Sequence, residues 1–288
     1  MTKLAKTRTG LFLLFTGLQL VIGYITFQKY RDSWVLTVLM LTPLLSVILT
    51  KWVTCEQWQW GYLRLKISHH WRDYLDAWLG VIGVAFLGAL VYFWVYPSDF
   101  APLASKFAQQ HQLRTNGAYL SILATMLPLA VVFNPIAGLL FCFGEEVAWR
   151  GYLLPKLATR LSWFQAVGLS SFIWGLWHAP LVWVWLGMNY QRIHSLAAIG
   201  AQIGLCLVMG GILSVLFLKT QCIWVPTLAL NAIDKFTPQT LFMEQNQPVN
   251  LLVGPNLIGW IGGLGLILWA LGCYYYLWHL SRPVRLSR

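Results

Sequence analysis

Apolar residues dominate the chain in long runs, and short polar stretches separate these runs. A transmembrane helix needs about 20 consecutive apolar residues, so most of the runs are long enough to cross a bilayer. The seventh run is short and contains Pro226, Asn231 and Asp234, which is typical of backbone that lines a protein cavity instead of lipid. The pattern predicts eight helices, over residues 11–27, 34–53, 75–96, 119–146, 163–185, 197–218, 223–233 and 256–280.

The composition agrees with this pattern. The 288 residues are 58% hydrophobic and only 10% charged, and the mean hydropathy is +0.62. Soluble domains are less apolar and more charged, and the five Cys residues are an odd number without C-x-x-C spacing. These features exclude a soluble enzyme, a disordered tail and a disulfide scaffold. The predicted fold class is an all-α polytopic membrane protein with about eight transmembrane helices, surrounded by the lipid bilayer.

The basic residues predict the orientation. The net charge is +11, but Lys and Arg lie singly between apolar runs, so we expect no nucleic-acid partner. The termini and alternate loops together carry more than twice as many Lys and Arg as the remaining loops, so both termini are predicted to be cytoplasmic. Residues 55–74 mix aromatic and basic residues and predict an amphipathic segment at the interface. Two glycine pairs, Gly200 with Gly204 and Gly259 with Gly263, have the spacing of close helix contacts.

Adjacent carboxylates end the fourth run. Asp and Glu number only nine in the whole chain, yet Glu145 and Glu146 are neighbours at the end of an apolar segment. In a helix, Glu146 and Arg150 are four residues apart and share a face, which predicts a structural ion pair. Glu145 has no basic residue at the matching positions, so we expect a desolvated carboxylate suited to a general base. An interfacial salt-bridge cluster without chemistry is the alternative.

A histidine lies in the middle of the fifth run. His178 follows Trp174 by one helical turn, within Trp174-Gly175-Leu176-Trp177-His178-Ala179-Pro180. A lone buried histidine is more often a packing residue, but an acidic pair entering from the same membrane side favours a site. Trp174 is a candidate supporting residue of that site.

These two segments resemble the first two motifs of the CPBP family, which contains CAAX prenyl proteases, bacteriocin-processing proteins and Abi proteins. The first motif is Glu-Glu-x-x-x-Arg, matched by Glu145, Glu146 and Arg150, and the second is an aromatic residue followed by His, matched by Trp174 and His178. The resemblance implies a CPBP-like helical core and an intramembrane endopeptidase of the glutamic type. In such an enzyme Glu145 and His178 would activate water, in a site open to the cytoplasm.

The third family motif is His-x-x-x-Asn, and here Asn231 and Lys235 stand at its two positions. An Asn amide can stabilise an oxyanion, so Asn231 is a catalytic candidate, and Lys235 is a candidate cationic donor beside it. Asn231 could equally be a polar contact between helices. The resemblance divides the chain into three N-terminal spans over residues 1–118, a core over residues 119–236, and a C-terminal loop and last span over residues 237–288.

Two mechanisms fit Glu145 and His178. In the metal-free one, Glu145 takes a proton from water, His178 protonates the leaving amine and Asn231 stabilises the oxyanion. In the other, both residues would bind zinc, but a catalytic zinc normally has three protein ligands and the sequence lacks a His-Glu-x-x-His helix. We therefore expect no metal and no cofactor.

The leading functional hypothesis is an intramembrane endopeptidase acting on a peptide or protein substrate at the membrane. The departures at Asn231 and Lys235 favour an alternative, a non-catalytic member of the fold that acts as a membrane partner or bacteriocin-immunity factor. The broken seventh run suggests a transporter as a third hypothesis, although no inverted repeat accompanies it.

Overall fold

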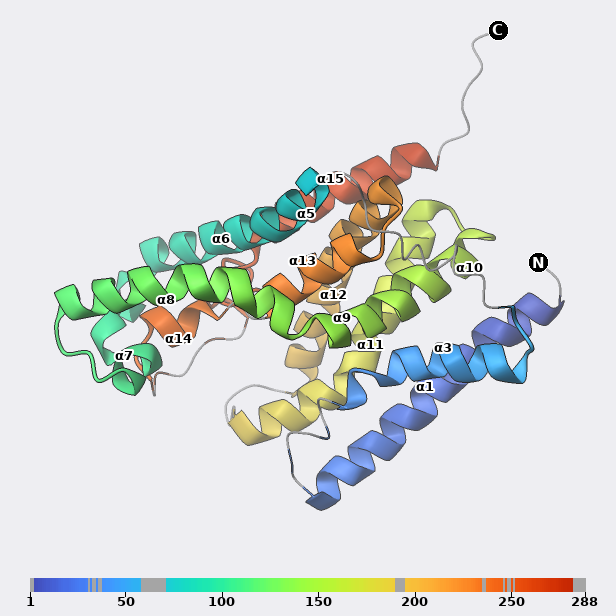
Figure 1. Cartoon of the computed structure of the whole chain (residues 1–288), viewed down its shortest axis with the longest axis horizontal. Helices are drawn as coiled ribbons and strands as arrows, with labels where there is room; N and C mark the ends of the chain where they lie inside the picture. Colours follow the sequence, from blue (N-terminus) through green and yellow to red (C-terminus); the bar gives the residue numbers. More distant parts are fainter. Residues whose placement is uncertain are drawn as a thin grey trace, which may run out of the picture.

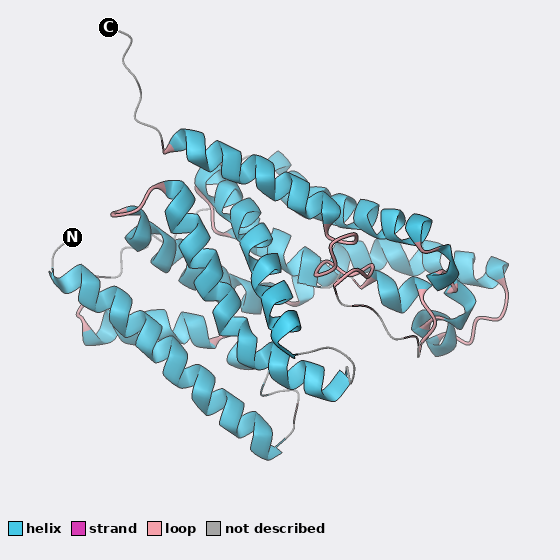
Figure 2. Cartoon of the chain, turned by 180° about the vertical axis from the view of Figure 1, so that it is seen from behind, coloured by secondary structure: helices cyan, strands magenta, loops and turns pink. Residues whose placement is uncertain are grey.

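The computed structural model describes residues 3–30, 32, 35, 38–57, 71–189, 195–234, 237–245, 247, 250 and 252–281. Every regular element in these ranges is a helix, which confirms the predicted all-α class (Figures 1 and 2). The helices labelled in Figure 1 are α1 (Lys3–Tyr30), α3 (Thr42–Val53), α5 (Trp71–Leu75), α6 (Val81–Val95), α7 (Lys106–Gln110), α8 (Asn116–Ala137), α9 (Leu139–Glu146), α10 (Leu154–Ala158), α11 (Trp163–Asn189), α12 (Ser195–Thr220), α13 (Trp224–Asp234), α14 (Pro238–Phe242) and α15 (Leu264–Leu280). Two π-helical segments, η1 (Asp76–Gly80) and η4 (Val147–Leu153), join α5 to α6 and α9 to α10.

Several helices have the length and surface of membrane spans. Within the described residues, four are long and apolar enough to cross a bilayer: Thr7–Tyr30, Trp71–Val95, Asn116–Phe133 and Leu196–Thr220. Helices α3 and α15 are shorter apolar helices, and α11 and α13 coincide with the fifth and seventh predicted runs. Large apolar side chains such as Val21, Leu87 and Leu120 are exposed, as a lipid-facing surface requires. The chain is a multi-pass integral membrane protein.

Three predicted boundaries were wrong. The third span begins at Trp71, because η1 continues α5 into α6 without a break. The fourth run is two helices that meet at Gly138, and the last helix begins at Leu264, because the glycine-rich residues 252–263 form turns. Most of the predicted interfacial segment, residues 58–70, lies outside the described residues.

The break between α8 and α9 has an identifiable cause. Pro135 has no backbone N–H to donate to the carbonyl of Val131 one turn earlier, and Trp78 Nε1 donates to that carbonyl instead, at 2.9 Å. At Gly138 a Cβ atom would overlap Oδ1 of Asn231, so only glycine allows this close approach to α13. The break thus places α9, which carries Glu145, directly against α13.

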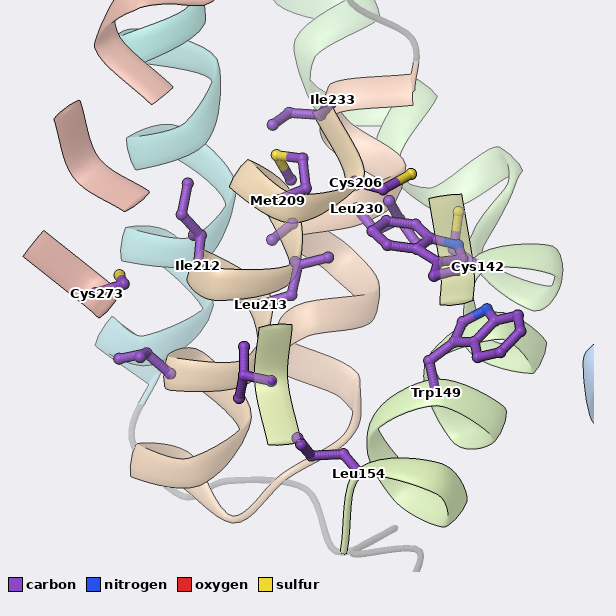
Figure 3. Close-up of a cluster of buried hydrophobic side chains, with 14 of the residues drawn as sticks. Cys142, Trp149, Leu154, Cys206, Met209, Ile212, Leu213, Leu230, Ile233 and Cys273 are labelled. Carbon is purple, nitrogen blue, oxygen red and sulfur yellow. The ribbon is translucent and has the colours of Figure 1, made fainter. Parts of the chain in front are cut away.

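The core lies where α11, α12 and α13 meet the α9–η4–α10 segment (Figure 3). Cys206, Met209, Ile212 and Leu213 on α12 lie in one cluster with Leu230 of α13, and Trp149 of η4 borders it. Helix α12 packs against both α11 and α13 and so holds these two helices of the candidate site together.

The close contact between α11 and α12 involves different glycines from the predicted ones. A Cβ added at Gly200 or Gly204 would meet nothing within 4 Å, so these two are not contact residues. Gly175 and Gly210 are contact residues, because a Cβ at Gly175 would lie 2.8 Å from Cα of Ile203 and a Cβ at Gly210 would overlap Oγ of Ser171. Gly259 and Gly263 approach backbone within the turns before α15 instead of another helix.

We expect Gly175→Ala to destabilise the protein by about 1–3 kcal/mol, because the added methyl group forces α11 and α12 apart. Gly204→Ala is the matched control, since its methyl group enters open space and alanine favours a helix. Thermal unfolding in detergent micelles measures both. Equal melting temperatures for the two variants would contradict the assigned contact.

A polar cluster ties η4 and α10 to the two N-terminal helices. Glu56, just after α3, accepts hydrogen bonds from Lys156 Nζ at 2.8 Å and from the Tyr152 hydroxyl at 3.0 Å. Arg8 of α1 completes it, with its Nε 3.6 Å from the same carboxylate. Burial alone raises the pKa of Glu56, but the hydrogen bond and charge of Lys156, together with Tyr152, outweigh it and hold the pKa below its ordinary value.

The lowered pKa predicts a pH-dependent contribution to stability. Glu56 stabilises the fold fully above its ordinary pKa of about 4.3, and this contribution is lost as the pH falls through the lower pKa of the folded state. Glu56→Gln should therefore cost about 1 kcal/mol at pH 7 and progressively less below about pH 4. The exposed Glu244→Gln is the control. A difference between Glu56→Gln and wild type that persists unchanged in acid would refute the assignment.

Candidate functional site

The ion pair predicted from sequence is present in the interior. Arg150 Nη1 donates to Glu146 Oε1 at 2.7 Å, and the two side chains are 2% and 0% exposed. Glu146 is the last residue of α9, and Arg150 lies in η4. Single π-helical turns inside α-helices are frequent at functional sites. One oxygen of Glu146, Oε2, and one nitrogen of Arg150, Nη2, have no partner within the described part of the chain.

Trp174 of α11 contacts both charged groups of the acidic motif. Its indole Nε1 donates to Oε2 of Glu145 at 2.8 Å, and the face of its ring lies under Arg150, with Cζ 4.4 Å from the centroid. The ring edge therefore satisfies an oxygen of Glu145 while the ring face stabilises the guanidinium. Trp174, expected only as a supporting residue, is the contact that joins the two sequence motifs.

His178 lies one turn further along α11. Its Nδ1 is 3.0 Å from the carbonyl oxygen of Trp174, and its ring packs edge to face against Trp174 and Trp177 at centroid distances of 5.5 and 4.7 Å. The carbonyl can only accept, so Nδ1 carries a hydrogen and donates it. In a neutral imidazole the lone pair is then on Nε2. His178 is partly buried, whereas Glu145 is almost fully buried.

Asn231 of α13 lies against α9. It is fully buried, and its Oδ1 accepts a weak hydrogen bond from Cys142 Sγ at 3.6 Å. Cys142 and Glu145 are three residues apart on α9 and so share a face, which puts Asn231 one turn from the candidate base. Lys235, the second residue of the altered motif, lies outside the described residues.

Sequence reasoning missed two residues near the site. Cys206 of α12 lies with its Sγ 3.8 Å from Nδ1 of His178, and Asp234 at the end of α13 interacts electrostatically with Glu145. Cys206 lies in an apolar run, where a cysteine is normally interpreted as a small hydrophobic residue. Asp234 interrupts the short seventh run, but no spacing rule connects it to Glu145.

The arrangement holds a carboxylate and an imidazole at different parts of Trp174, with the amide of Asn231 one turn from the carboxylate. The carboxylate of Glu145 accepts a hydrogen bond from Trp174 and has lone pairs left to accept one from water. The imidazole of His178 can receive a proton on Nε2 and release it again. Among the described residues, no group of three or more His, Cys, Asp and Glu side chains could hold a metal ion. The metal-free site therefore stays a prediction.

We expect Glu146→Leu to destabilise the protein by about 3–5 kcal/mol, because Arg150 would remain buried without its partner. The double variant Glu146→Leu/Arg150→Met should recover most of that loss, because it removes both charges and keeps an apolar chain over Trp174. Unfolding in micelles measures both, with Glu244→Leu as an exposed control. A double variant no more stable than Glu146→Leu would contradict a buried ion pair.

Comparisons with known proteins agree with the motifs. Residues 115–234, from the start of α8 to the end of α13, match the family model described as Type II CAAX prenyl endopeptidase Rce1-like. One curated relative is CAAX prenyl protease 2 of Methanococcus maripaludis, 34% identical over 106 residues. The alignment covers 36% of this chain and 39% of that protein, so the chain matches well under half of the relative's length. This central segment, which carries Glu145, His178 and Asn231, is therefore similar in sequence to CAAX prenyl proteases.

Proposed function

We propose that this chain is an intramembrane endopeptidase that hydrolyses a peptide bond of a membrane-associated protein or peptide, using water activated by Glu145. The observation that carries the proposal is the double use of Trp174. Its indole N–H donates to Glu145 and its backbone carbonyl accepts from His178, so residues of two helices are fixed around one residue. A pair held in this way is preorganised for proton transfer.

The reaction begins with a water molecule between Glu145 and His178. Glu145 takes a proton from the water. The oxygen of that water attacks the carbonyl carbon of the substrate, and a tetrahedral oxyanion forms. Asn231 stabilises that oxyanion through its amide. The proton taken up by Glu145 passes to Nε2 of His178, which delivers it to the amide nitrogen. The carbon–nitrogen bond then breaks, a carboxylic acid and an amine leave, and both side chains return to their starting protonation states.

Glu146 and Arg150 have a supporting role in this scheme. Their ion pair keeps the guanidinium stacked on Trp174, and that contact fixes the indole that binds Glu145. The relative in the comparison is named CAAX prenyl protease 2. For this chain the proposed substrate class is a peptide or protein at the membrane.

The site is proposed to open toward the cytoplasm. One end of the molecule in Figure 1 contains the start of α1, the end of α3, α10 and the end of α15. The positive-inside assignment requires these segments to lie on one side of the membrane. Arg8, Lys51 and Lys156 belong to helices at this end, and the η4 segment of the site leads directly into α10.

A membrane partner or immunity factor without catalysis is the second candidate. Asn231 and Lys235 favour it, because they replace the His and Asn of the third family motif. Losing an oxyanion donor typically costs a factor of about 10²–10³, so replacement by another donor is compatible with turnover.

We expect Glu145→Gln to lower the cleavage rate by about 10²–10⁴-fold, because the amide keeps the shape of the side chain but cannot take a proton. His178→Gln should lower it by at least about 10²-fold for the same reason. The assay incubates membranes with a library of apolar and C-terminal peptides, with and without a chelator, and detects products by mass spectrometry. Glu244→Gln and His279→Gln make the same chemical changes at exposed positions and should cleave like wild type.

Each outcome separates the candidates. Products that vanish in both site variants and survive the chelator support the metal-free endopeptidase. Products lost on chelation support zinc instead, and cleavage by Glu145→Gln at the wild-type rate contradicts the proposed base. If wild type is silent, Asn231→His is the informative variant, because gained cleavage identifies a decayed protease and continued silence favours the membrane partner.

A further inference from the structure

Two groups lie beside Nδ1 of His178, and a third group contacts one of them. Nδ1 lies 3.0 Å from the carbonyl oxygen of Trp174 and 3.8 Å from Sγ of Cys206. Gln202, one turn before Cys206 on α12, directs its Nε2 toward the same sulfur at 3.7 Å. The imidazole is therefore held between a backbone acceptor on α11 and a thiol on the neighbouring helix.

The hydrogen-bonding capacities of these groups favour one tautomer of His178. The carbonyl of Trp174, 3.0 Å from Nδ1, can only accept, so it favours a hydrogen on Nδ1. The sulfur of Cys206 accepts from the amide N–H of Gln202, and its remaining lone pair can accept the hydrogen on Nδ1. Both neighbours of Nδ1 thus favour one tautomer, with the lone pair on Nε2.

The sulfur is also held firmly in place. Cys206 is 1% exposed, and α12 is pressed against α11 at Gly175, where even a methyl group would meet backbone. Water therefore cannot easily replace the thiol beside His178.

We propose that Cys206, oriented by Gln202, is a positioning residue that holds His178 in the Nδ1–H tautomer and turns Nε2 toward the reacting groups. This assignment rests on the proposed function for its catalytic consequence, but the tautomer is a property of the protein itself. Cys206 touches neither water nor substrate in this scheme. It acts only through His178.

The experiment combines ¹⁵N NMR of histidine-labelled protein in micelles with the peptide cleavage assay. His178→Gln assigns the ring signals of His178 among the six histidines. Wild type should show a protonated Nδ1 and an unprotonated Nε2. Cys206→Val, which removes the acceptor, should shift those signals toward a mixture of tautomers and lower kcat about five- to tenfold without changing KM.

Two further variants serve as controls. Cys206→Ser keeps an acceptor beside Nδ1 and should retain the wild-type ring signals and most of kcat. Cys273→Val changes another buried thiol, on α15, and should alter neither readout.

The outcomes separate this inference from the proposed function. A protonated Nε2 in wild type, or ring signals unchanged by Cys206→Val, contradicts the role of Cys206 whether or not the protein cleaves peptides. The predicted ring signals without Glu145-dependent cleavage support the positioning of His178 and contradict the proposed function alone.

Discussion

The removal of charged groups from water is the constraint on which this site depends. Glu145, Glu146 and Arg150 are all almost completely buried, and an isolated charge in such surroundings is costly, so each must find a partner inside the protein. Trp174 meets this demand with different parts of one residue. Its indole N–H donates to Glu145, its ring stacks with the guanidinium of Arg150, and its backbone carbonyl accepts from His178.

Irregular helices make these contacts possible. The break at Gly138 brings α9 against α13, where Asn231 lies beside Cys142. Beyond Glu146 the backbone widens into the π-helical η4, which carries Arg150 toward Trp174.

Local spacing accounts for what could be predicted from the sequence. Glu146 with Arg150, and Trp174 with His178, are each four residues apart on one helix, and both pairs are in contact. Apolar runs predicted the helices themselves, because lipid demands that backbone bonds close within each segment.

Contacts between helices account for what could not be predicted. Nothing in the spacing joins Glu145 to Trp174 or Cys206 to His178, because those pairs depend on how α9, α11 and α12 pack. The glycine spacing predicted the wrong helix contacts for the same reason. Gly200 and Gly204 have the contact spacing but face open space, whereas Gly175 lies in the contact itself.

The central claim is that Glu145 and His178 act on one water molecule as a unit. The cleavage rate of the double variant Glu145→Gln/His178→Gln, compared with wild type and both single variants, tests it most directly. Residues that act as a unit are strongly non-additive, so the double variant should be about as slow as the slower single variant. Independent losses that multiply in the double variant would contradict the shared site.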